Sequence, residues 1–408
     1  MKPVLTLFCL LCAFAKEVGA ANPPPLLMTY FIPSDKQPIP GYVERMDKVM
    51  SEVQRFYRRS MESNGYGSLT FMLDRDAASH LRVYVVRGKK QMSDYGRQSS
   101  GKIREEVKAS LMAAGVNPDN HVLVIFQVLL DRQGDKTIEI GPYVGTGDNL
   151  TGTCWFYDDE RLDPGKLNSK APGGYYMYPC SLGHFNSEYI GGIAHELGHA
   201  LGLPHVAGLK TTPGHSMMAV GNHHYGEELR HEGAGSYLHP ASAMLLSHCR
   251  SFVGDIADAR IHPKIQFRDL HSVYDSTNHK LMLNGNIICE PSTFGILAYN
   301  DDEGIQSDYD ATGWISSVDR GGNFKLEIED VKPGNFELRL QVVCKTGATH
   351  TFKLNYQVDN DGTPDLSKLN TSSPDAAERL KKLKSLYGQG LINKEDYDKK
   401  VKEIMNSL

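Results

Sequence analysis

The sequence has no excess of positive charge. Its 44 lysines and arginines are outnumbered by 49 aspartates and glutamates, and the formal net charge is -5 at pH 7. A nucleic-acid-binding protein needs a basic patch or stripe, so we expect no nucleic-acid partner. The sequence also lacks a run of about 20 apolar residues, the length that a transmembrane helix needs, so we expect no transmembrane segment.

One shorter apolar run lies at the N-terminus. Lys2 precedes the run from Val4 to Ala15, and the small residues Val18-Gly19-Ala20 follow it. This is the organisation of a cleaved export signal, so we interpret residues 1–20 as a signal peptide. A buried N-terminal helix is the alternative interpretation. The mature chain is expected to be secreted, to the extracellular space or the periplasm.

Strand-like and helix-like patterns alternate over the first part of the chain. Apolar β-like runs occupy 26–33, 81–88 and 121–130, and helical spacing occupies 41–62 and 99–114. This order predicts a mixed, mostly parallel sheet with helices packed against it. Further helices are expected over 188–203 and from Pro240 to Phe252.

The composition changes near residue 264. Short β-like runs then alternate with turn signals such as Asn284-Gly285, which predicts a small all-β sandwich of the Ig-like type. A polar stretch and a charged helical tail follow. We therefore expect an α+β fold class with these segments: signal peptide 1–20, first domain 21–263, β-sandwich 264–358, linker 359–374 and helical hairpin 375–408.

A motif with metal-binding chemistry lies inside the helix expected over 188–203. His195 and His199 are four residues apart, so both imidazoles project from one helical face toward one ion. Glu196 is placed to act as the general base. Gly202 allows a sharp turn that brings His205 round as a third ligand. Three imidazoles with an open water position are typical of a catalytic zinc site, so we expect one catalytic Zn²⁺.

The stretch HELGHALGLPH, from His195 to His205, resembles the metzincin signature HExxHxxGxxH. Metzincins also have a methionine turn beneath the zinc, for which the resemblance implies Met218, with Met217 as the alternative. Residues 221–238 are similar to a group of secreted bacterial metzincin-type peptidases. The resemblance implies a peptide-cleaving domain over 21–263, in which a substrate strand pairs with an edge strand within 141–153.

Some positions depart from the metzincin pattern or are open to two interpretations. Val220 stands where some metzincins have a tyrosine, so Tyr225 is a candidate oxyanion stabiliser; a packed aromatic is the alternative. The cluster of histidines near Met218 could bind substrate or a second metal, although surface histidines are favoured. A structural Ca²⁺ is conceivable at nearby glutamates, but a solvated loop is favoured. These residues are His223, His224 and His231, and Glu227, Glu228 and Glu232.

Cysteines are few, seven in 408 residues, and two of them lie in the expected signal peptide. Export permits disulfides, and the odd remainder leaves at least one thiol without an intrachain partner. Cys154 and Cys180 flank the expected substrate cleft, so we favour a bond between them. Cys289 and Cys344 each end an expected strand, as inter-sheet bridges do. Cys249 is expected to be a buried free thiol.

The motif favours a zinc-dependent endopeptidase acting on a protein or peptide substrate. The alternative is a surface or extracellular binding protein with a structural or inactive zinc site. Glu196 discriminates between the two, because a structural site needs no base and usually closes the fourth position. The tail over 375–408 resembles the short helical domain called SHOCT, which implies self-association or docking.

Overall fold

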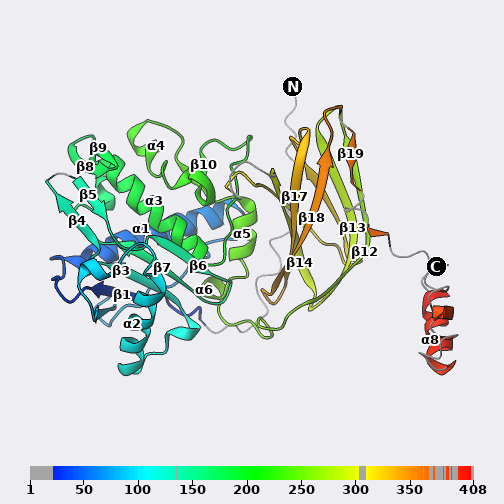
Figure 1. The fold of residues 1–408 in the computed structure, drawn as a ribbon, viewed down its shortest axis with the longest axis horizontal. Helices are drawn as coiled ribbons and strands as arrows, with labels where there is room; N and C mark the ends of the chain where they lie inside the picture. The colour runs from blue at the N-terminus through cyan, green and yellow to red at the C-terminus, as the bar shows by residue number, and fades with distance from the viewer. Residues whose placement is uncertain are drawn as a thin grey trace.

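The computed structural model describes most of the chain. The described residues are 22–134, 136–302, 309–361, 363–366, 371–372, 380, 383–385, 387 and 394–405. The predicted signal peptide lies outside them. Figure 1 shows an α+β part beside a part made of long strands, with α8 (Lys394–Met405) apart from both, in agreement with the expected α+β class. Among the described residues, no helix is long and apolar enough to cross a membrane.

A five-stranded sheet forms the centre of the α+β part, with the strand order β2-β1-β3-β7-β6. Its strands are β1 (Leu27–Ile32), β2 (Val83–Arg87), β3 (Val122–Gln127), β6 (Val144–Gly147) and β7 (Gly152–Tyr157). All are parallel except β6, which runs antiparallel to β7 at the edge. β1 and β3 are buried throughout, as strands covered on both faces must be. The expected mixed, mostly parallel sheet is confirmed.

Long helices pack around this sheet. They are α1 (Tyr42–Ser63), α2 (Ser100–Ala113) and α3 (Leu182–Ala200). The helix α3 begins at Leu182, before the expected 188, because the Ser181 hydroxyl accepts a hydrogen bond from the His184 N–H at 3.1 Å and caps it. Nearly every residue of α3 is buried, so this helix is an internal element rather than a surface one.

Shorter elements complete the α+β part. Ahead of α3 lie the 3₁₀ turns Met92–Asp94, Pro118–Asn120 and Pro164–Lys166 and the hairpins β4 (Leu130–Gln133) with β5 (Lys136–Glu139) and β8 (Pro172–Tyr176) with β9 (Tyr178–Ser181). After it come β10 (His215–Ser216), a π-helical turn (Met217–Gly221), α4 (Glu227–Arg230), β11 (Ser236–Tyr237), α5 (Pro240–Leu246) and α6 (Arg250–Val253). The expectation of one helix from Pro240 to Phe252 is wrong. The first helix ends at Leu246 with Ser247 at its C-cap, where the Ser247 hydroxyl donates to the Met244 carbonyl at 2.7 Å, and Cys249 is extended.

The second part consists of two facing sheets, one with the order β16-β13-β12-β20 and the other β15-β14-β17-β18-β19. Their strands are β12 (Lys264–Asp275), β13 (Lys280–Glu290), β14 (Thr293–Asp302), β15 (Thr312–Ser317), β16 (Asn323–Ile328), β17 (Gly334–Cys344), β18 (Thr349–Val358), β19 (Pro364–Asp365) and β20 (Thr371–Ser372). Alternate residues such as Leu281, Leu283, Leu338 and Leu340 are buried between the sheets. This alternation is what a sandwich requires of its inner faces.

The sandwich packs directly on the α+β part. Leu297, Tyr299 and Val343 of the sandwich belong to the same buried cluster as the core of the α+β part. The Ala207 N–H donates to the Ala311 carbonyl at 2.8 Å, which joins the segment after α3 to the segment before β15. The two parts therefore share a core.

The cysteines do not follow the sequence-based expectations fully. Cys154 and Cys180 are free thiols, so the expected bond between them is absent from the structure. Cys154 is fully buried in β7 with Sγ against the Leu123 carbonyl, whereas Cys180 lies in the β8–β9 hairpin. Cys289 and Cys344 are also free, but their Sγ atoms are 3.4 Å apart between the two sheets, so that pairing stays a prediction.

The C-terminal tail is described only in part. Its helix α8 spans Lys394–Met405, and the ring of Tyr397 in α8 stacks on Tyr387, with centroids 4.7 Å apart. Two stretches of the tail therefore lie together. The SHOCT-like hairpin over 375–408 stays a prediction.

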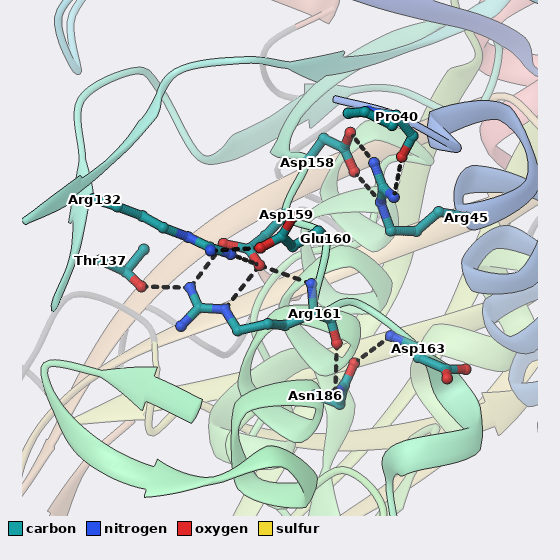
Figure 2. Close-up of polar contacts among 10 residues, drawn as sticks. All are labelled: Pro40, Arg45, Arg132, Thr137, Asp158, Asp159, Glu160, Arg161, Asp163 and Asn186. Carbon is teal, nitrogen blue, oxygen red and sulfur yellow. Dashed lines mark hydrogen bonds and ion pairs between the residues drawn. The ribbon is translucent and has the colours of Figure 1, made fainter. Parts of the chain in front are cut away.

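Two carboxylates at the end of β7 are held by arginines (Figure 2). Asp158 accepts hydrogen bonds from Arg45 Nε and Nη2, both at 2.6 Å, and from the Tyr30 hydroxyl at 2.6 Å. Asp158 is almost fully buried and Arg45 lies on α1. Such a bidentate, charge-assisted pair is among the stronger polar contacts in proteins, and here it joins the central sheet to α1.

The neighbouring carboxylate, Asp159, connects the sheet to α3. It accepts from Arg161 Nε at 2.8 Å and Nη2 at 2.7 Å, and from Arg132 Nη2 at 2.9 Å. Asn186 of α3 donates to the Arg161 carbonyl at 3.1 Å and accepts from the Asp163 N–H at 2.7 Å. Figure 2 shows these contacts as one continuous path, which fixes the N-terminal half of α3.

The substitution Asp159→Asn should lower the free energy of unfolding by about 3 kcal/mol, because it leaves the mostly buried Arg161 guanidinium without its charged partner. Burial acts to raise the pKa of Asp159, but hydrogen bonds and charge from Arg161 and charge from Arg132 outweigh it and hold this pKa below 3.8. The ionised carboxylate thus stabilises the fold above about pH 4, the unfolded value. This contribution is lost as the pH falls through the lower folded pKa.

Urea unfolding at pH 7 and near pH 3 measures both effects. The control is Glu160→Gln, because Glu160 is 61% exposed and forms a surface ion pair with Arg132; its effect should stay within about 1 kcal/mol. Equal unfolding midpoints for the two variants at pH 7 would contradict the role given to Asp159.

Candidate active site

Three histidines converge beside the edge of the central sheet. His195 and His199 lie one turn apart on α3, and Gly202, with φ +85°, turns the chain back after the helix. His205 follows this turn. The Nε2 atom of His199 is 3.1 Å from Nε2 of His195 and 3.0 Å from Nε2 of His205, and the three are arranged as a possible metal-binding group.

The hydrogen bonds of these imidazoles indicate what the group can hold. Nδ1 of His195 lies 2.7 Å from the Met217 carbonyl, and Nδ1 of His199 lies 2.9 Å from the Leu203 carbonyl. A carbonyl only accepts, so each Nδ1 carries the proton and each Nε2 presents a lone pair. Burial and the neighbouring His199 lower the pKa of His195 to about 3. Lone pairs that face one another at 3 Å fit a cation between them, and imidazole nitrogens suit zinc.

Glu196 lies next to this group but does not join it. Its Oε2 accepts a hydrogen bond from the Gly145 N–H of the edge strand β6 at 2.7 Å. Burial raises the pKa of Glu196 to about 7, against the opposing effect of this hydrogen bond. A carboxylate with a raised pKa beside a metal site is suited to accepting and returning a proton.

The position of α3 depends on glycines in the strands below it. A Cβ at Gly145 would overlap the carbonyl oxygen of Glu196, and a Cβ at Gly147 or Gly152 would overlap the carbonyl oxygen of Ala200. The helix backbone therefore rests on strand backbone without side chains between them. This contact brings the Glu196 carboxylate within reach of the β6 main chain.

The two methionines after β10 have different roles. Met217 supplies its backbone carbonyl to His195. Met218 is fully buried, and a Cβ at Gly198 would collide with its Sδ. Met218 thus packs beneath the α3 segment that carries the histidines, and the sequence predicted it for this place.

Tyr225 does not lie with the histidines. Its hydroxyl donates to Glu52 Oε1 at 2.7 Å, and its ring packs edge-on against Phe56, with centroids 5.7 Å apart. Both partners belong to α1. The structure therefore assigns Tyr225 to packing against α1, which corrects the expectation of an oxyanion stabiliser.

The other candidate side chains of the loop have separate partners. His223 Nδ1 lies 2.6 Å from Glu188 Oε2 of α3. Glu232 Oε2 accepts from Arg230 Nε at 2.6 Å, and Glu227 Oε1 lies 2.7 Å from His224 Nδ1. The glutamates suggested for a Ca²⁺ site thus point to different partners, so their arrangement does not support that site.

Sequence reasoning missed one aromatic residue at the site. Tyr309, from the sandwich segment before β15, stacks on His205 with ring centroids 3.7 Å apart. Tyr309 is 45% exposed, so it forms part of an accessible wall. No local pattern marks it, because its relation to His205 exists only after the sandwich packs on the α+β part.

The substitution Gly145→Ala should lower the free energy of unfolding by about 2–3 kcal/mol, since the added methyl meets rigid helix backbone. Thermal unfolding measures this loss. The matched control is Gly101→Ala in α2, where nothing lies within 4 Å of the added methyl; it should stabilise slightly, by about 0.5–1 kcal/mol. If Gly145→Ala melts at or above the temperature of the unmodified chain, the close approach of α3 to β6 is not as described.

Comparisons with known proteins give structural neighbours only. No family model matches the chain, and no curated protein matches it in sequence. A solved structure of OgpA from Akkermansia muciniphila superposes with a TM-score of 0.70 at 21% identity, covering 86% of this chain and 98% of that chain. A structure of catalytically inactive OgpA in complex with an O-glycopeptide substrate, glycodrosocin, gives 0.69 at 21% identity, with 85% and 96% covered. The chain thus has the fold of OgpA along nearly the whole length of that protein.

Proposed function

We propose that the chain is a zinc-dependent endopeptidase of the metzincin type. The observation that carries the proposal is the convergence of three imidazoles, in which His199 Nε2 lies 3.1 Å from His195 Nε2 and 3.0 Å from His205 Nε2, with the Glu196 carboxylate beside them. His195, His199 and His205 would hold one zinc ion. When bound, zinc lowers the pKa of water toward about 7 and polarises the carbonyl of the bond to be cut.

Glu196 would carry the proton during hydrolysis. Its carboxylate accepts a proton from the attacking water and returns it to the departing amine. The Gly145 N–H holds Oε2 at 2.7 Å, which restricts the carboxylate to one orientation. The Met217 and Leu203 carbonyls fix the tautomers of His195 and His199, so that both present Nε2 to the ion.

An extended peptide would bind along β6. This strand stands at the end of the sheet order, and an edge strand can take an added strand by main-chain hydrogen bonds. Tyr309 would form a wall of the cleft next to His205. The β-sandwich would then contribute a side chain to the substrate cleft.

We propose O-glycosylated peptides as the substrate class. The support is the fold shared with OgpA, one structure of which holds an O-glycopeptide substrate. Near the N-terminal end of α3, the β8–β9 hairpin presents Tyr178, which is 53% exposed and whose hydroxyl lies 3.1 Å from His184 Nε2. An exposed aromatic with polar neighbours suits the mixed apolar and hydroxyl surface of a sugar.

The segments of the chain outside the site would have separate roles. Residues 1–20 would direct export, and 21–263 would form the peptidase domain with 264–358 as the sandwich. The tail over 375–408 would mediate self-association or docking. A binding protein with an inactive zinc site is the weaker candidate, because the Glu196 carboxylate is bonded to Gly145 and leaves a fourth metal position open.

The substitution Glu196→Gln should reduce hydrolysis by at least about 100-fold while zinc stays bound, because an amide cannot accept the proton of water. The assay uses a peptide with one O-glycosylated threonine, with zinc measured by elemental analysis of the same samples. A chelator should abolish activity of the unmodified chain, and added zinc should restore it.

Two controls accompany this experiment. Glu105→Gln, at a carboxylate that is 71% exposed on α2, should keep full activity. The same peptide without its sugar should be cut far more slowly. If Glu196→Gln kept more than about a tenth of the original rate, this would contradict the general-base role. Equal rates on both peptides would show that the enzyme does not require the glycan.

Tyr309→Ala should lower kcat/KM by about 3- to 10-fold with the zinc content unchanged, since a stacked ring contributes about 0.5–1.5 kcal/mol. Tyr309→Phe keeps the ring and should retain most of the activity. Steady-state kinetics on the glycopeptide distinguish the two variants. An alanine variant with unchanged kinetics would show that the sandwich does not serve the site.

A further inference from the structure

A second group of potential metal ligands lies near the methionine turn. His215 belongs to β10, His224 precedes α4, and Glu227 is the first residue of α4. One ligand atom from each of the three lies within 4.8 Å of the others. The rings of His215 and His224 stack with centroids 3.6 Å apart and an interplanar angle of 13°, and His224 Nδ1 is 2.7 Å from Glu227 Oε1.

We propose that His215, His224 and Glu227 form a second divalent-cation site, suited to zinc, that braces the methionine turn. Two imidazoles and one carboxylate are ligands that zinc accepts. In a tetrahedral zinc site the ligand atoms are separated by roughly 3.3–3.6 Å, as bond lengths of about 2.0–2.2 Å require. The three side chains are only partly buried, so they have room to rotate to this spacing, which separates the stacked rings and lengthens the contact between His224 and Glu227.

The surrounding charge favours a cation at this place. Besides Glu227, the Glu228 carboxylate lies against Gly235 in the same loop. The only described arginine of α4, Arg230, is directed elsewhere: its Nη1 donates to the Leu167 carbonyl at 2.8 Å and its Nε to Glu232 at 2.6 Å. The negative charge of the Glu227 carboxylate is one that a divalent ion would neutralise.

The position of the site indicates what the ion would do. His215 lies two residues before Met217, whose carbonyl holds His195, and β10 pairs with β11 through His215 and Ser236. An ion shared by His215, His224 and Glu227 would tie this short strand to the turn that leads into α4. An ion that binds the folded chain and not the unfolded one stabilises the fold by mass action. Zinc at this site would therefore stabilise the methionine turn, whose Met217 carbonyl contacts His195.

Zinc alone, added to the full chain after complete removal of metal, tests the inference. Equilibrium dialysis with elemental analysis should find two zinc ions per unmodified chain. His224→Ala and Glu227→Gln should each bind one, and the control His223→Ala, at the adjacent histidine paired with Glu188, should still bind two. Glu227→Gln keeps the shape of the side chain and covers the case in which His224→Ala fails to fold.

A further variant, His199→Ala, separates this site from the catalytic one. It should keep one zinc ion, and zinc should still raise its melting temperature, an increase that adding His224→Ala removes. One zinc per unmodified chain and none in His199→Ala would overturn the second site and leave the proposed function intact. Two ions retained by both His224→Ala and Glu227→Gln would likewise overturn it. One zinc per unmodified chain that His224→Ala removes and His199→Ala retains would support this site and count against the catalytic one.

Discussion

The contact of helix backbone on strand backbone, made possible by three glycines, is the constraint on which the rest of the site depends. A side chain at Gly145, Gly147 or Gly152 would overlap the backbone of α3. The backbone of the helix therefore contacts the backbone of the strands directly. Through this contact the Gly145 N–H reaches the Glu196 carboxylate. Any larger residue would lift the helix and separate the carboxylate from its donor. The Asp159–Arg161–Asn186 path then holds the other half of α3 against the sheet.

Local features of the site could be predicted from the sequence, because they depend on spacing along one element. Helix geometry places His195 and His199 on one face of α3, and the turn expected at Gly202 brings in His205. The alternation of strand-like and helix-like patterns likewise predicted the mixed sheet. Features that depend on distant contacts could not. The partner of Tyr225 is Glu52 on α1, and the residue that stacks on His205 is Tyr309 of the sandwich. The mistaken Cys154–Cys180 pair has the same origin, because the sequence did not show which face of β7 Cys154 occupies.

The sandwich is part of the site's architecture. The hydrogen bond between Ala207 and Ala311 lies two residues after His205, so the third histidine is positioned from the helix on one side and from the sandwich on the other. Leu297, Tyr299 and Val343 extend the core of the α+β part across the junction. Two parts that share a core in this way unfold together more readily than separate domains do. The three histidines thus belong to a larger cooperative unit than the motif alone indicates.

The hydrogen bond from Gly145 to Glu196 also has a consequence for how a peptide lies on β6. In an antiparallel strand the N–H and C=O of one residue point to the same side, so Gly145 faces the open edge with its N–H already engaged. A peptide added to this edge would lack one main-chain hydrogen bond of the ladder, at Gly145, beside the Glu196 carboxylate. The main chain of the peptide would be hydrogen-bonded to β6 on both sides of Gly145 and least restrained opposite Gly145. The missing hydrogen bond at Gly145 would thereby determine which bond of the peptide can bend toward the histidines.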